Sequence, residues 1–125
     1  MRLETLVLAL TLLFLPIAAI AHDALQGPNG GQTVDDAGHH VEFTMKDGQI
    51  VFFLSDGAGK PISSTKASGR AMIQDGAKQA ALDLVAAKPN LLVAKTASPL
   101  SPGAKLVVSI KLGDGHDVKA RFVVR

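Results

Sequence analysis

Four histidines are the residues of this 125-residue chain whose type and spacing could do chemistry: His22, His39, His40 and His116. The chain has no Cys, so no thiolate competes with imidazole, which is a good ligand for Cu, Ni, Zn and Co. No Ser stands in a Gly-x-Ser-x-Gly elbow, and at least five of the nine Asp residues stand in turn-like contexts: Asp47, Asp56, Asp75, Asp114 and Asp117. We therefore do not expect an enzyme, and we consider the histidines as candidate metal ligands.

His22 is the most informative of the four. If a leader is cleaved after Ala21, His22 becomes the first residue, and its α-amine and ring Nδ1 can chelate one ion together. A second imidazole would complete a three-nitrogen set that suits square-planar Cu(II), with Asp23 as a possible oxygen ligand. Cleavage after Ala19 would abolish this chelate. The alternative is that His22 is an ordinary terminal residue.

His39 and His40 must point to opposite faces if they lie in one strand, because neighbouring side chains alternate. His40 shares its face with Glu42, a spacing that can place two ligands on one ion. Glu42 could instead accept a hydrogen bond from the ring of a ligating His40. His39 is in phase with the apolar residues of the segment, so it is either a further ligand or a partly buried ring at a turn.

His116 lies between Asp114 and Asp117 in a Gly-rich segment. It could bind an ion, although the polarity of an ordinary hairpin loop also accounts for it. Met45 and Met72 could be soft Cu(I) ligands. Because Met45 is in phase with the apolar face of its segment, we expect it in the core.

The first 21 residues resemble a secretory signal peptide. Arg2 gives a positive start, Leu6–Leu15 is apolar apart from Thr11, and Ala19-Ile20-Ala21 presents small residues to a signal peptidase. A retained membrane anchor is the alternative, but Leu6–Ala21 is short for a span of about 20 residues. We expect an exported, periplasmic protein with no membrane span after cleavage.

Composition limits the mature chain to one domain. The 13 Lys and Arg residues nearly balance the 11 Asp and Glu residues, so nucleic acid is not an expected partner. We divide the chain into a signal peptide (1–21), an irregular N-terminal arm (22–32) and one domain (33–125).

Four Asp-Gly pairs, at 47–48, 56–57, 75–76 and 114–115, punctuate the domain and favour tight turns. The segments between them alternate with a period of two. The alternation is clearest in Leu106–Leu112, which we expect to pair with Val118–Val124. Ile50–Leu54 is apolar on both faces, as in a central strand. The pattern predicts an all-β fold, an antiparallel immunoglobulin-like β-sandwich of seven to eight short strands. Only Ala77–Lys88 is Ala-rich enough for a helix to be an alternative.

Several motifs resemble those of small exported bacterial proteins. They are Gly27-Pro28-Asn29-Gly30-Gly31, Gly38-His39-His40-Val41-Glu42-Phe43, Val51–Asp56 and Gly59-Lys60-Pro61. A similar segment occurs in periplasmic adaptor subunits of heavy-metal efflux systems, and the resemblance implies divalent-metal or copper handling. Several such proteins carry a further His in the Gly-Gly motif, where this chain has Asn29. The His expected at the mature N-terminus is also similar to that of exported copper-resistance β-sandwiches.

The sequence thus predicts a periplasmic protein that binds a transition metal through His22 and His40, with Asp23, His39 or Glu42 completing the site. Cu(II) is the expected ion, with Zn, Ni and Co as alternatives, and an envelope efflux component is a possible partner. The competing interpretation is a metal-free, immunoglobulin-like module that docks onto another envelope protein.

Overall fold

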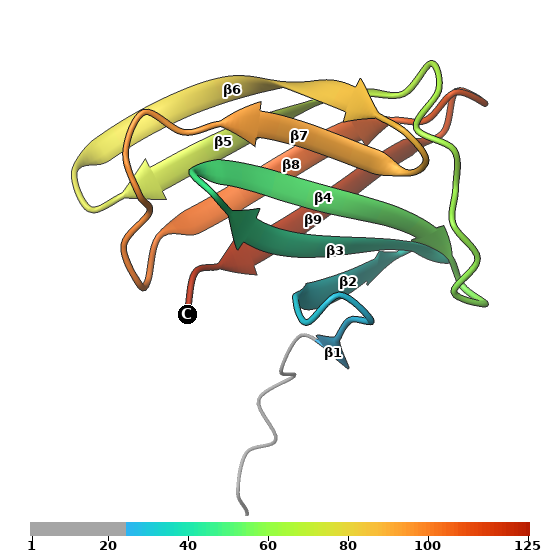
Figure 1. Cartoon of the computed structure of the whole chain (residues 1–125), viewed down its shortest axis with the longest axis horizontal. Coiled ribbons are helices and arrows are strands. Elements are labelled where there is room, and N and C mark those ends of the chain that lie inside the picture. The colour runs from blue at the N-terminus through green and yellow to red at the C-terminus, as the bar shows by residue number, and fades with distance from the viewer. Residues whose placement is uncertain (1–24) are drawn as a thin grey trace, which may run out of the picture.

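The computed structural model describes residues 25–125, which form nine antiparallel strands and no helix (Figure 1). The predicted signal peptide, His22 and Asp23 lie outside the described residues. The strands are β1 (Leu25–Gln26), β2 (Gln32–Asp36), β3 (His39–Lys46), β4 (Gln49–Asp56), β5 (Ser68–Asp75), β6 (Lys78–Ala87), β7 (Leu91–Lys95), β8 (Lys105–Lys111) and β9 (Asp117–Val123). The prediction of an all-β, antiparallel fold is confirmed. No helix in residues 25–125 has the length and apolarity needed to cross a membrane.

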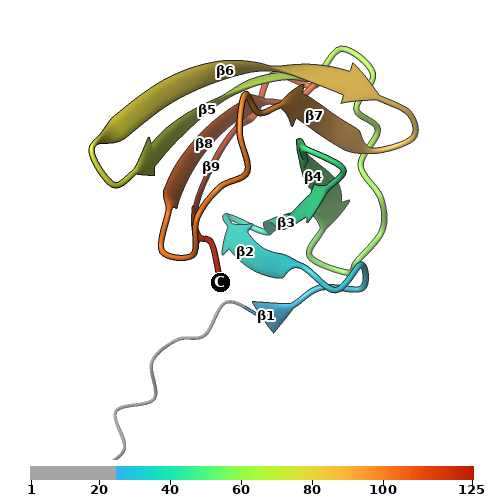
Figure 2. The same ribbon diagram turned by 60° about the vertical axis from the view of Figure 1, so that its left-hand side comes forward.

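The nine strands form a single sheet in the order β1-β2-β3-β4-β7-β6-β5-β8-β9. Figure 2 shows that this sheet curls, so that β2 and β3 come to face β9. The two separate sheets of an immunoglobulin-like sandwich are not seen. The reason is β6, whose residues 78–84 pair with β5 and whose residues 85–87 pair with β7. One strand therefore joins what would otherwise be two sheets.

Tight turns set the register of the hairpins. Asp47 and Gly48 have φ values of 52° and 73°, and the flanking Lys46 and Gln49 are paired, as the Asp-Gly motif predicts. Two consecutive residues with positive φ occur again at Ala37-Gly38, which joins β2 to β3. No Asp-Gly motif marks that turn in the sequence, and it was not predicted. It makes His39 the first residue of β3.

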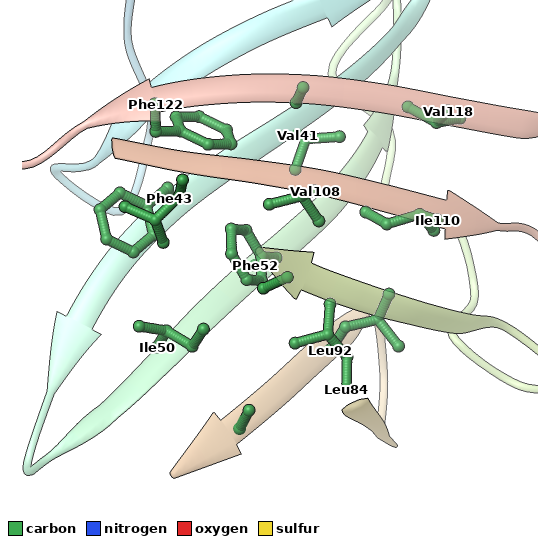
Figure 3. Packing of buried hydrophobic residues seen from close by; sticks show 14 of the residues in the cluster. Val41, Phe43, Ile50, Phe52, Leu84, Leu92, Val108, Ile110, Val118 and Phe122 are labelled. Carbon is green, nitrogen blue, oxygen red and sulfur yellow. The ribbon is translucent and has the colours of Figure 1, made fainter. Parts of the chain in front are cut away.

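Alternating strands build the core inside the curl. Along β8 and β9 every second residue is buried, as the period-two pattern predicts, and in the observed register Leu106 lies opposite Phe122. The rings of Phe43, Phe52 and Phe122 pack with centroids 5.4–5.9 Å apart, although they come from three strands (Figure 3). The concave face of the sheet therefore encloses a continuous apolar cluster.

The prediction of a central strand at Ile50–Leu54 is confirmed, because β4 lies between β3 and β7 and buries Val51 as well as Phe52. The prediction that Met45 packs in the core is wrong. Met45 is 41% exposed because β3 runs past the apolar cluster before it turns.

The Ala-rich segment forms strand β6 and not a helix, because its main chain pairs with β5 and its Leu82 and Leu84 face inward. The predicted irregular arm is also partly ordered. Leu25 and Gln26 pair with Thr33 and Gln32, so β1 adds a short strand to the sheet.

Side chains hold β2 beside β9 where the sheet curls back on itself. The Gln32 side-chain amide donates to the carbonyl of Val123 at 2.6 Å, and the Lys119 N–H donates to the Asp36 carboxylate at 2.8 Å. This seam brings the start of β3 close to the turn between β8 and β9.

Candidate metal-binding residues

His39 and His116 lie together, although 77 positions separate them in sequence. Their ring centroids are 5.5 Å apart, with the ring planes inclined by 43°. The Ala37-Gly38 turn places His39 at the beginning of β3, and the hairpin between β8 and β9 carries His116. Two imidazole ligands on one ion have their ring centres about this far apart, since a Zn–N bond is about 2.0–2.1 Å long.

Asp114 orients His116. The Nδ1 of His116 lies 2.8 Å from one oxygen of Asp114, and the backbone N–H of His116 donates to the other oxygen at 2.9 Å. The pKa of the Asp114 carboxyl is lowered, first by this backbone hydrogen bond, then by the side-chain bond to His116 and the nearby charges of His116 and His39. With Nδ1 engaged, Nε2 is the nitrogen of His116 that can meet an ion. A carboxylate behind a ligating imidazole is the usual arrangement at metal centres.

His40 points to the opposite face of β3 from His39, as strand alternation predicts. Its Nε2 lies 3.3 Å from a carboxylate oxygen of Asp35, which is the residue opposite it on β2. The same carboxylate accepts the N–H of Gly38 and so stabilises the turn. Asp35, and not Glu42, is therefore the acidic partner of His40.

Glu42 is only 3% exposed, although it faces away from the apolar core. The Gly-rich loop at 27–31 covers it. Its two oxygens accept hydrogen bonds from the backbone N–H groups of Asn29 and Gly31 and from the side-chain amide of Asn29, at 2.8–3.2 Å. A Cβ on Gly27 would collide with the Glu42 carboxyl, so only glycine fits there. Two of the four motifs that carry the family resemblance thus meet in one hydrogen-bonded cluster.

The five residues predicted as ligands are not brought together by the described part of the chain. His39, His40 and Glu42 belong to one strand but have separate partners, while His22 and Asp23 lie outside residues 25–125. Within residues 25–125, no three His, Asp or Glu side chains are grouped closely enough to hold a metal ion by themselves. Among the described residues, His39 and His116 bring two imidazole rings into contact.

His116 is a possible ligand from its sequence context, but its pairing with His39 was not predicted. Its position beside Asp114 was a usable signal, because Asp-x-His in a tight turn is suited to orienting an imidazole. The proximity of His39 could not be read from the sequence, since it depends on the seam between β2 and β9.

Comparison of the chain with family models, with curated proteins and with solved structures gives no match. The resemblance to small exported metal-handling proteins therefore stays a prediction.

Proposed function

We propose that this protein is a small exported protein that binds a transition-metal ion, with Cu(II) as the expected ion and Zn, Ni and Co as alternatives. It would buffer the ion or pass it on, and it would catalyse no reaction. The observation that carries the proposal is the pairing of His39 with His116, whose ring centroids are 5.5 Å apart.

The His39–His116 pair supplies two of the ligands that a metal site needs. Imidazole nitrogen is the common ligand of these ions, and Asp114 already holds the His116 ring in one orientation. His116 is 67% exposed at its side chain, so an ion bound to it remains reachable by further ligands. Such an open site suits transfer of an ion better than permanent storage.

His22 and Asp23 remain the predicted additional ligands. Leu25, the first described residue, lies opposite Thr33 of β2 in an antiparallel pair. If the mature chain begins at His22, its amine and ring would join the two imidazoles of the pair in place of the predicted partner His40.

Calorimetric titration of the purified exported protein with Cu(II) and Zn(II) tests the proposal, after its intact mass has identified the first residue. We expect His39→Ala and His116→Ala each to weaken binding by at least about tenfold, the loss seen even for residues that only support a ligand. His40→Ala is the matched control, since His40 is adjacent in sequence but lies on the other face. It should leave the affinity within about twofold.

Two results would contradict the proposal in different ways. Absence of binding by the wild-type protein would remove the metal function. Binding that only His22→Ala abolishes would keep the metal function but reject the His39–His116 pair.

A further inference from the structure

Strand β6 has a long free edge. It pairs with β5 over Lys78–Leu84 but with β7 only over Val85–Ala87, because β7 diverges toward the loop that begins at Thr96. Figures 1 and 2 show the first half of β6 extending beyond β7. This half of the strand has a neighbour on one side only.

The free edge exposes six main-chain groups. The hairpin closes at the pair Asp75 and Lys78, so residues 78, 80 and 82 exchange hydrogen bonds with β5. The N–H and C=O groups of Gln79, Ala81 and Asp83 therefore point away from β5. Within residues 25–125 these six groups have no hydrogen-bond partner.

This edge has few of the features that usually prevent pairing. It contains no Pro, and Lys78, at the start of the strand, is the one charged residue among the inward positions beside the free groups, since Ala80, Leu82 and Leu84 are apolar. The other edges of the sheet differ. β1 is two residues long, and the edge of β9 is bridged to β2 by the side chains of Gln32 and Asp36.

We propose that the edge of β6 is the pairing surface for a second copy of this chain. An antiparallel register centred on Ala81 places Ala81 opposite Ala81 of the partner subunit and Gln79 opposite Asp83 of the partner subunit. This register pairs all six free groups of each copy, forming six hydrogen bonds across a two-fold axis. A shift of two residues in either direction leaves some of these groups unpaired.

The side chains fit the same register. On the outer face no like charges lie opposite one another, since Gln79 meets an Asp and the two Ala81 residues meet each other. On the inner face Ala80 meets Leu82 of the partner subunit. A pocket of about 430 Å³ opens on this inner face and is lined by Ile73, Leu82 and Leu100 among others. It can hold the side chain of Leu82 of the partner subunit.

Sedimentation velocity over a range of protein concentrations tests the proposal, with the purified full-length expression product in a chelating buffer that removes metal-dependent association. We expect a reversible dimer. Ala81→Pro deletes an N–H that bonds nothing within one copy, and it should weaken the dimer by at least about tenfold. Thermal unfolding of the variant checks that it folds.

A second variant keeps the test decisive if Pro disturbs β6. Ala81→Lys places two ammonium groups opposite each other at the two-fold axis. Met72→Lys is its matched control, because Met72 lies beside Ala81 on β5, on the same outer face but away from the edge. We expect Ala81→Lys to weaken the dimer and Met72→Lys to leave it unchanged.

Equal dimerisation of the two variants would overturn the proposal. A wild-type protein that stays monomeric up to about 1 mM would also overturn it and would leave the edge to a strand of another protein.

Discussion

At the scale of single residues, Glu42 shows how a residue that sequence reasoning assigns to a site can serve the fold. Its carboxylate satisfies two backbone N–H groups that the loop at 27–31 would otherwise bury without partners. A buried donor left without an acceptor costs about 1–3 kcal/mol. The role of this carboxylate in the fold is thus to accept hydrogen bonds.

Glu42→Ala should lower the free energy of unfolding by about 2–3 kcal/mol, because the N–H groups of Asn29 and Gly31 lose their acceptor. Urea denaturation measures the loss. Glu42→Gln keeps one acceptor oxygen and should lose about half as much. A Glu42→Ala protein as stable as the wild type would show that water replaces the carboxylate at no cost.

Asp114 gives a prediction about pH. Its pKa is lowered in the folded protein, first by the backbone hydrogen bond from His116. A carboxyl with a depressed folded pKa stabilises the native state above its unfolded pKa of about 3.9, and the contribution is lost as the pH falls through the folded value. An NMR titration of the metal-free protein should find the Asp114 pKa below that of an ordinary Asp. His116→Ala should raise this pKa only in part, since the backbone bond remains. A pKa that does not change in the variant would mean that the imidazole has no influence.

At the scale of secondary-structure elements, the seam between β2 and β9 decides which residues become neighbours. Two side-chain hydrogen bonds, from Gln32 to Val123 and from Lys119 to Asp36, hold strands that share no backbone ladder. The seam fixes the end of β2, the turn after it and therefore His39.

Asp36→Ala should destabilise the protein by about 1–2 kcal/mol, because the hydrogen bond from Lys119 is made to a charged acceptor. It should also increase hydrogen exchange at the Lys119 amide. Asp83→Ala is the comparison. Asp83 forms an exposed ion pair with Arg70 at 3.6 Å, and its loss should cost less than about 0.5 kcal/mol. If the two variants are equally stable, the seam contributes nothing measurable.

At the scale of the whole molecule, one apolar cluster supports all parts of the curled sheet. Phe52 is completely buried and packs against Phe43 of β3 and Phe122 of β9. The packing of β3 and β4 against β9 depends on these three rings.

Phe52→Ala should lower the free energy of unfolding by about 3–5 kcal/mol, because it removes a large side chain from a closely packed interior. Phe53→Ala, one position along, provides the control. Phe53 lies on the outer face and is only half-buried, so its loss should be clearly smaller. Thermal unfolding of both variants measures the two losses of stability. Equal losses would show that Phe52 contributes no more to the core than the outward-facing Phe53.

Local pattern was enough to predict much of the fold. The Asp47-Gly48 turn, the central position of Ile50–Leu54 and the pairing of Leu106–Leu112 with Val118–Val124 all follow from turn chemistry and from a period of two. These features depend on neighbours within a few residues, or on a hairpin that joins adjacent strands. The sequence by itself therefore determined most of the strand content and the hairpins at Asp47-Gly48, Asp75-Gly76 and Asp114-Gly115.

Only the tertiary structure decided how the strands close on one another. That β6 joins β5 to β7, that the loop at 27–31 covers Glu42, and that His39 lies beside His116 all depend on pairings between distant segments. Alternation tells which side of a strand is buried, but it does not say which strand lies next to it or where a sheet bends. For this reason the sequence could name the histidines, while the curl of the sheet chose which two of them meet.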